Sequence, residues 1–119
     1  MPIVDEMITP DAVSHDMEGP GVTSSLRGEL LGFHRRMCAA IPDRRFEILD
    51  TIAENDRVVL RIHNHGAHTG GDLGIPPTGN RIDVGAIVIL RFEDGRIAES
   101  WNFIDQLAFY QQLRILNVR

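Results

Sequence analysis

The sequence contains no lysine, because all twelve of its basic residues are arginines. Mechanisms that need a lysine amine, as a Schiff base or as a nucleophile, are therefore excluded. Cysteine is almost as scarce, and the single Cys38 excludes an internal disulfide and a Cys-x-x-Cys redox or zinc motif. We expect Cys38 to be an inert thiol that faces the core, in a reducing compartment.

The sequence also lacks a basic stretch and a long apolar run. Its net charge is −5 and its pI is near 5.4, so a nucleic-acid partner would be repelled by the protein's own field. No segment approaches the ~20 apolar residues of a membrane span, and Asp5 and Glu6 stand where a secretory signal would begin with positive charge. We therefore expect a cytoplasmic protein that binds neither nucleic acid nor membrane.

The length and the hydrophobic content suit one domain. The chain has 119 residues, of which 43% are hydrophobic, and this is enough to bury one core. We therefore treat residues 1–119 as a single domain.

The hydrophobic pattern predicts one helix followed by two β-hairpins. Apolar residues recur every three or four positions from Thr23 to Ile41, and Pro42 should end that helix. Strands are expected at 46–53, 58–62, 82–92 and 97–104, with turns at 54–56 and 93–95 and a short helix at 107–113. This order predicts an α+β fold, in which a strongly curved antiparallel sheet packs on the N-terminal helix. The uncovered concave face is the expected pocket for an apolar small molecule, and Phe33 of the helix should line it.

The most compact group among the five histidines is His63, His65 and His68. A metal site is one interpretation, but it needs a bulge near Gly66 to bring His68 round and a carboxylate from elsewhere. We favour the other interpretation, in which these side chains line the pocket or an edge strand and no metal or other cofactor is bound. Arg61 shares the strand face of His63 and could hold a ligand oxygen.

Trp101, Phe103 and Asp105 alternate onto one face of the last expected strand. A carboxyl beside two aromatic rings resists ionisation, and the resulting rise in its pKa suits a general acid or base. Asp105 also precedes a predicted helix, where a capping aspartate is common. The pattern alone does not separate these two interpretations.

Two further groups leave alternatives open. Arg81 and Asp83 share a strand face, and with Asp105 they could open an epoxide with water, although an ordinary ion pair between Arg81 and Asp83 or a neighbour is favoured. His15 lies in a segment, residues 11–16, that is either a short strand at the pocket mouth or a solvated loop.

Ordered sequence blocks cover nearly the whole chain, from Asp11 to Leu113. The blocks are Ile41-Pro42-Asp43 with Phe46-Glu47-Ile48, Gly66-Ala67-His68-Thr69-Gly70, Gly74-Ile75-Pro76-Pro77-Thr78-Gly79, and Phe92-Glu93-Asp94-Gly95-Arg96-Ile97 with Glu99-Ser100-Trp101 and Asp105-Gln106-Leu107. Together they resemble the SnoaL-like polyketide cyclases, which share the cone fold of the nuclear transport factor two-like proteins.

The resemblance implies a mechanism and a set of site residues. Characterised cyclases of that family close a ring by intramolecular aldol condensation without metal or covalent intermediate, and an aspartate acts as general acid/base. Asp105 occupies the matching position. His15 and His68 match pocket histidines, and Trp101 resembles the family's aromatic wall. The chain is thus expected to be a cofactor-independent enzyme for an apolar carbonyl compound, with a non-catalytic binding module as the alternative.

The sequence departs from the family pattern at several positions. Ala67 stands where threonine is usual, and Ser100 stands where histidine is common. Relatives also carry a long helix before the Asp11 segment, whereas here only residues 1–9 precede it. A second copy could cover the opening that this leaves, so we expect a homodimer.

Overall fold

The computed structural model describes residues 2–15, 23–71 and 76–113. Its elements, in chain order, are α1 (Pro2–Met7), β1 (Ile8–His15), β2 (Thr23–Ser25), α2 (Leu26–Ala40), β3 (Arg45–Glu54), β4 (Arg57–Ala67), β5 (Arg81–Glu93), β6 (Arg96–Ile104) and α3 (Gln106–Leu113). Among the described residues, no helix combines the length and the apolar character that a membrane crossing requires.

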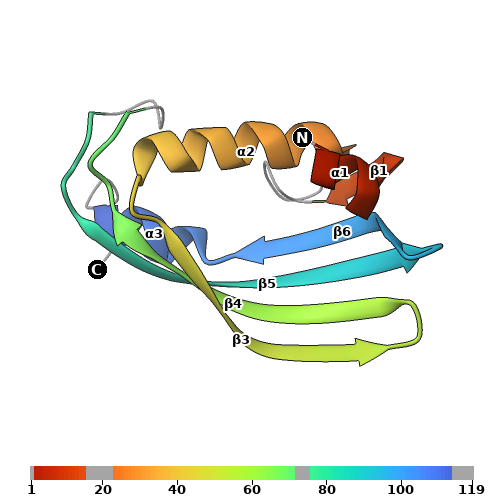
Figure 1. Cartoon of the computed structure of the whole chain (residues 1–119). Coiled ribbons are helices and arrows are strands. Elements are labelled where there is room, and N and C mark those ends of the chain that lie inside the picture. Colours follow the sequence, from red (N-terminus) through yellow and green to blue (C-terminus); the bar gives the residue numbers. More distant parts are fainter. Residues whose placement is uncertain (1, 16–22, 72–75, 114–119) are drawn as a thin grey trace.

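The six strands form one curved sheet in the order β2-β1-β6-β5-β4-β3 (Figure 1). Both predicted hairpins are confirmed: β3 pairs with β4 and β5 pairs with β6, each pair antiparallel. The segment around His15 is the strand β1, and its pairing with β6 is parallel. The sheet is therefore antiparallel throughout its four long strands and mixed at β1.

The hairpin turns form where the sequence supplies residues that tolerate positive φ. Asn55 has φ 56° in the first turn, and Asp94 and Gly95 have φ 52° and 80° in the second. Asparagine, aspartate and glycine adopt this region at the lowest cost. The turns thus fix the register of both hairpins.

Helix α2 forms over the predicted segment and is capped at both ends. The Ser25 hydroxyl accepts a hydrogen bond from the Gly28 N–H at 3.4 Å, and the Ile41 N–H donates to the Met37 carbonyl at 2.8 Å. Pro42 follows and prevents the helix from continuing.

Two hydrophobic clusters attach α2 to the sheet, one near each end of the helix. At the C-terminal end, Met37, Ala40 and Ile41 pack with Ile82 and Val84 of β5 and Leu113 of α3. At the N-terminal end, Leu26 packs with Ile8 and Ala12 of β1. Helix α2 therefore lies across one side of the curved sheet (Figure 1).

The strand register assigns each side chain to one of two faces of the sheet. We call the face that contains Ile82 and Val84 the inner face, because these residues pack against α2. Alternation places Asp83, Gly85 and Ile87 on the opposite side, which we call the outer face. Residues paired across neighbouring strands share a face, so the register extends this assignment over β3 to β6.

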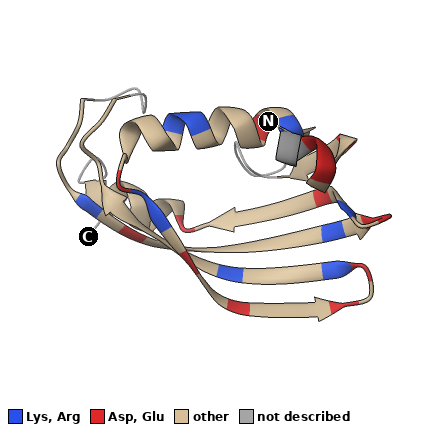
Figure 2. Cartoon of the chain, in the orientation of Figure 1, with Lys and Arg blue, Asp and Glu red and all other residues tan. Residues whose placement is uncertain are grey.

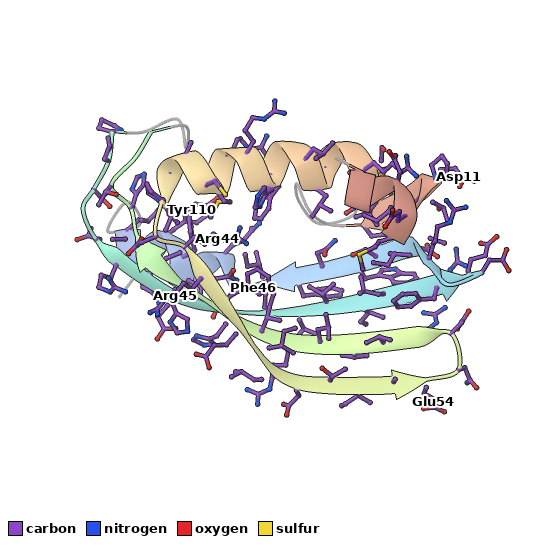
Figure 3. The ribbon with its side chains drawn as sticks, in the orientation of Figure 1. Asp11, Arg44, Arg45, Phe46, Glu54 and Tyr110 are labelled. Carbon is purple, nitrogen blue, oxygen red and sulfur yellow. The ribbon has the colours of Figure 1, made fainter. Side chains whose placement is uncertain are left out.

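Between its two clusters, α2 leaves much of the inner face uncovered. Phe46 and Ile48 of β3 are 58% and 54% exposed, although the register places them on this face. Figure 3 shows Arg44 and Phe46 in the space between α2 and the sheet, and Arg45 on the other side of β3. The inner face thus retains apolar side chains that nothing in the described structure covers.

Opposite charges face each other across the outer face of the β3–β4 hairpin. Figure 2 shows acidic residues on β3 beside basic residues on β4, and the register pairs Glu54 with Arg57. The Arg61 Nε donates to Asp50 Oδ2 at 2.6 Å. Exposed ion pairs of this kind add little to the free energy of unfolding, but they favour the observed register of β3 and β4.

Helix α3 continues the chain along the part of β5 that β6 does not reach. The Gln112 amide bonds both backbone groups of Asp83: it accepts from the N–H at 2.6 Å and donates to the carbonyl at 2.9 Å. These bonds satisfy backbone groups that would otherwise be left at a strand edge. The short helix expected at 107–113 is confirmed.

The expectation for Cys38 is wrong. Its thiol is exposed on α2, and Sγ lies 3.5 Å from His34 Nε2. The reason is helical geometry, because Cys38 follows the buried Met37 by one position and so points about 100° away from it.

Substitutions at Gly70 and Gly32 should have opposite effects on stability. A Cβ at Gly70 would lie 1.7 Å from the Ala39 carbonyl oxygen, so Gly70→Ala must shift the backbone and should destabilise the fold by about 1–3 kcal/mol. Gly32, inside α2, has nothing within 4 Å of that position, so Gly32→Ala should stabilise by up to about 1 kcal/mol. Urea unfolding of both variants measures this, and equal effects would contradict the packing described around Gly70.

Candidate functional site

The outer face contains a wide, open hollow of ≈ 430 Å³ over β4, β5 and β6. Its lining residues are Arg61, Ile62, His63, Gly85, Ala86, Ile87, Phe103, Ile104 and Asp105. Gly85 has no side chain at the centre of this group, whereas its neighbours on the same face, His63, Ile87 and Phe103, are large. The hollow therefore exists because a glycine occupies this position of β5.

Asp105 lies at one end of the hollow, directly after β6. Its N–H donates to the Gly85 carbonyl at 3.1 Å, and its Oδ1 accepts from the Ala108 N–H at 3.0 Å. The second contact makes Asp105 the N-cap of α3, one of the two roles that the sequence left open. The side chain is nevertheless exposed, and Oδ2 makes no hydrogen bond within the described residues. The cap therefore leaves one carboxylate oxygen available for chemistry.

Arg61 and Phe103 supply a cation and an apolar wall to the same hollow. Phe103 is 55% exposed, and Ile87, its partner on β5, is 44% exposed. Arg61 uses Nε for its bond to Asp50, and its other nitrogens make no hydrogen bond to a described residue. An apolar molecule with one polar oxygen would find both kinds of contact here.

His63 and His65 lie side by side on the outer face of β4, together with Asp83 of β5. The Asp83 carboxylate contacts Nδ1 of His63, and its Oδ1 lies 3.3 Å from Nδ1 of His65. On the other side, His65 Nε2 is 3.0 Å from Glu47 Oε1. A metal site at these histidines needed a carboxylate that the sequence did not identify, and the structure places Asp83 in that position.

His68 does not join His63 and His65. It is fully buried, and its Nδ1 accepts a hydrogen bond from the Thr78 N–H at 3.2 Å. The proton of the neutral ring therefore sits on Nε2, which is buried and has no hydrogen-bond partner in the described structure. His68 is also not among the residues that line the hollow.

Trp101 belongs to a separate network in the middle of β6. Its ring stacks on His15 at 5.1 Å between centroids, and Arg57 lies over it at 4.9 Å. His15 Nε2 is in turn 2.6 Å from Glu99 Oε2. Trp101 and Asp105 are four positions apart, which is about 13 Å along a strand, and Trp101 does not line the hollow, so it walls a different part of the outer face.

Glu99 is the centre of that network. Hydrogen bonds from Arg91 and then His15 hold the pKa of the Glu99 carboxyl below its usual range, and the Arg91 bond is 2.9 Å long. The bond to Glu99 also raises the pKa of the Arg91 guanidinium. Sequence reasoning missed Glu99, although its alternation with Trp101 could have placed both on one face.

The inner face has its own polar group, which the sequence did not single out. The Arg44 guanidinium donates to Asn64 Oδ1 at 3.3 Å and lies 5.7 Å from the Phe33 ring centre and 5.8 Å from that of Phe46. Its Nε is buried without a partner in the described structure, and burial lowers the pKa of the group. Alternation with Phe46 is the signal that could have located Arg44.

The structure thus divides the predicted site residues between two faces. Asp105, Arg61, His63 and Phe103 meet at the hollow, and His65 lies beside it. His15 and Trp101 lie elsewhere on the outer face, while Phe33 belongs to α2 above the inner face.

The three residues considered for epoxide opening are not assembled for it. Arg81 forms an ordinary ion pair, but its partner is Asp43, at 3.9 Å, and not Asp83, which is engaged by the two histidines. No direct contact joins either residue to Asp105 in the described structure.

Comparison with known proteins agrees with this fold and identifies the family. A protein from Catenulispora acidiphila with a ketosteroid isomerase-like fold matches with a TM-score of 0.70 at 18% identity, over 92% of this chain and 78% of its own. The fold class is therefore the ketosteroid isomerase-like cone. Comparison with curated proteins gave no match.

Family membership follows from closer matches. Residues 1–113 match the SnoaL-like polyketide cyclase family. IdmH, a proposed polyketide cyclase from Streptomyces antibioticus, is 32% identical over 95% of this chain and 86% of its own, with a TM-score of 0.79. AclR, a proposed hydroxylase from Streptomyces galilaeus, is 31% identical over 98% and 74%, with a TM-score of 0.81. The chain belongs to the SnoaL-like polyketide cyclase family.

Glu99→Gln should reduce stability at neutral pH and make no difference in strong acid. Because the folded-state pKa of Glu99 is lowered, its contribution is present above its unfolded pKa and is lost as pH falls through the folded value. We expect a loss of about 1 kcal/mol or less at pH 7, since the group is only partly buried. Urea unfolding between pH 2 and pH 7 measures it, with the exposed Glu54→Gln as control. A difference that persists undiminished at pH 2 would rule out the ionic origin.

Proposed function

We propose that this chain is an acid/base enzyme that moves protons on an apolar carbonyl compound, as an aldol-type cyclase does, with Asp105 as the proton-transfer residue. One observation supports it most: the exposed Asp105 carboxylate borders a hollow that also contains Arg61, His63 and Phe103. Membership of the cyclase family supports the same reaction class.

The arrangement provides each group that an aldol step requires. A carbon next to a carbonyl loses a proton to a base, and the carbonyl oxygen becomes negative as it does so. The free Oδ2 of Asp105 can accept the proton, while Arg61 or His63 can stabilise the oxygen. The enolate carbon then attacks a second carbonyl of the same molecule, and the alkoxide that forms takes the proton back from Asp105. Phe103 and Ile87 contact the apolar body of the substrate during both steps.

Asp105→Asn separates catalysis from helix capping. Asparagine is as good an N-cap as aspartate, so the unfolding free energy should change little. An amide cannot act as a base, so proton transfer should slow by about 10²–10⁴-fold. The measurement is deuterium uptake from D₂O, by mass spectrometry, into polycyclic ketones that have a C–H bond next to the carbonyl. This readout does not require the natural substrate.

Two comparisons complete this experiment. Asp105→Ser also keeps a capping side chain and should show the same loss of exchange, whereas Glu54→Gln, an exposed position on the same face, should keep full exchange. Exchange by Asp105→Asn at the wild-type rate would contradict the assignment. Binding of these ketones by the wild-type chain without any exchange would instead favour the non-catalytic binding module.

The inner face is the second candidate location for the substrate, because Phe46 and Ile48 are exposed there beside Arg44. Gly85→Val distinguishes the two faces. A Cβ at Gly85 would meet its nearest neighbour, His63 Cδ2, at 3.7 Å, so a side chain fits and fills the floor of the hollow. We expect the KM for ketone exchange to rise at least ~10-fold, while valine strengthens the strand.

Phe46→Leu is the matched change on the inner face and should leave the KM unchanged. A rise in KM for Phe46→Leu with no effect of Gly85→Val would place the substrate between α2 and the sheet. The hollow would then be excluded as the binding site.

A further inference from the structure

A cluster of His63, His65 and Asp83 lies on the outer face, beside the hollow. His63 and His65 are two residues apart on β4, and Asp83 of β5 is paired directly with His65. One nitrogen of each histidine and one carboxylate oxygen lie within 4.8 Å of one another. The three potential ligand atoms therefore converge on one point from two neighbouring strands.

A further carboxylate orients His65. Glu47 of β3 lies across the strand pair, and its Oε1 is 3.0 Å from His65 Nε2. A proton held on Nε2 by this contact leaves the lone pair on Nδ1, the nitrogen that faces Asp83. This carboxylate–histidine arrangement is the usual support of a metal-binding imidazole, since it fixes both tautomer and ring orientation.

The chemistry of the three atoms selects the type of ion. Two imidazole nitrogens and one carboxylate oxygen suit a first-row divalent transition metal, whereas Mg²⁺ and Ca²⁺ prefer oxygen alone. Arg81, the nearest arginine along β5, lies 3.9 Å from Asp43 and so does not neutralise Asp83 by a direct ion pair. We propose that His63 Nδ1, His65 Nδ1 and Asp83 bind a divalent transition metal such as Zn²⁺.

The site is open and adjoins the hollow. The Asp83 side chain is 62% exposed, so three protein ligands leave coordination positions to water or to another oxygen ligand. His63 belongs to both the cluster and the hollow lining, and its Nε2 lies 3.8 Å from the position of a Cβ on Gly85. A metal here therefore stands next to the place where a carbonyl compound would bind. The metal-binding proposal does not depend on the proposed acid/base activity of Asp105, because metal binding is measured without substrate.

Zn²⁺ titration of the whole chain by calorimetry tests the site. All variants should be made in a Cys38→Ser background, because Cys38 and His34 form a second pair of potential ligands on α2. We expect one Zn²⁺ per chain, with binding lost in Asp83→Asn and His65→Ala. Glu47→Gln should weaken it by about 10- to 100-fold. Asp50→Asn, an exposed carboxylate variant on the same face, should bind as the parent does.

Two outcomes would overturn the proposal. One is the absence of saturable one-to-one binding of Zn²⁺. The other is an affinity that Asp83→Asn and Asp50→Asn change equally. Imidazole ¹⁵N spectra of the Cys38→Ser parent, with all three proposed ligands intact, give a readout that does not depend on whether a ligand variant folds. Zn²⁺ should shift the ring nitrogens of His63 and His65 and leave those of His15 unchanged, and a shift confined to other histidines would also reject the site.

Discussion

The placement of the side chains around the hollow and in the His63–His65–Asp83 cluster depends on the uninterrupted pairing of β4 with β5. Eleven successive pairs join Arg57–Ala67 to Arg81–Arg91 without a register shift. A slip of one residue would exchange the two faces and would separate Asp83 from His65. The same pairing sets Gly85 opposite His63, which opens the hollow. Register, more than any single contact, therefore determines which side chains can act together.

Asp105 shows how a residue with a structural role can still leave a group available for chemistry. An N-cap contributes about 1 kcal/mol, and here the cap is given by Oδ1 alone. The cap fixes the carboxylate at the start of α3, at the rim of the hollow. A carboxylate held in place through one oxygen, with the other oxygen free, is suited to exchange a proton with a substrate. The structure confirms the N-cap interpretation of Asp105, and the acid/base interpretation stays a prediction that the cap does not exclude.

Local patterns in the sequence predicted the elements well, since hairpins and helix ends are encoded by neighbouring residues. The turns at Asn55 and Asp94 and the stop at Pro42 are examples. Pairing between distant segments was not predictable in the same way. Nothing near His15 indicates that β1 lies parallel to β6, and nothing near His63 indicates that its carboxylate partner is Asp83. The exposure of Cys38 was predicted wrongly. A helical pattern identifies the apolar stripe of a helix, but it does not show whether a residue at the edge of that stripe is buried or exposed.

Gly85 explains why the outer face can offer a site at all. A glycine in a strand interior destabilises the fold by roughly 0.5–1 kcal/mol relative to alanine, and a side chain would fit here without overlap. Packing therefore does not require glycine at this position. Its backbone carbonyl accepts the Asp105 N–H, so the strand pairing continues to the end of β6 and holds the carboxylate at the rim. Gly85 thus lowers the stability of the fold, keeps the neighbouring strands aligned and leaves space beside His63 and Asp105. These are the properties expected of a position in a binding site.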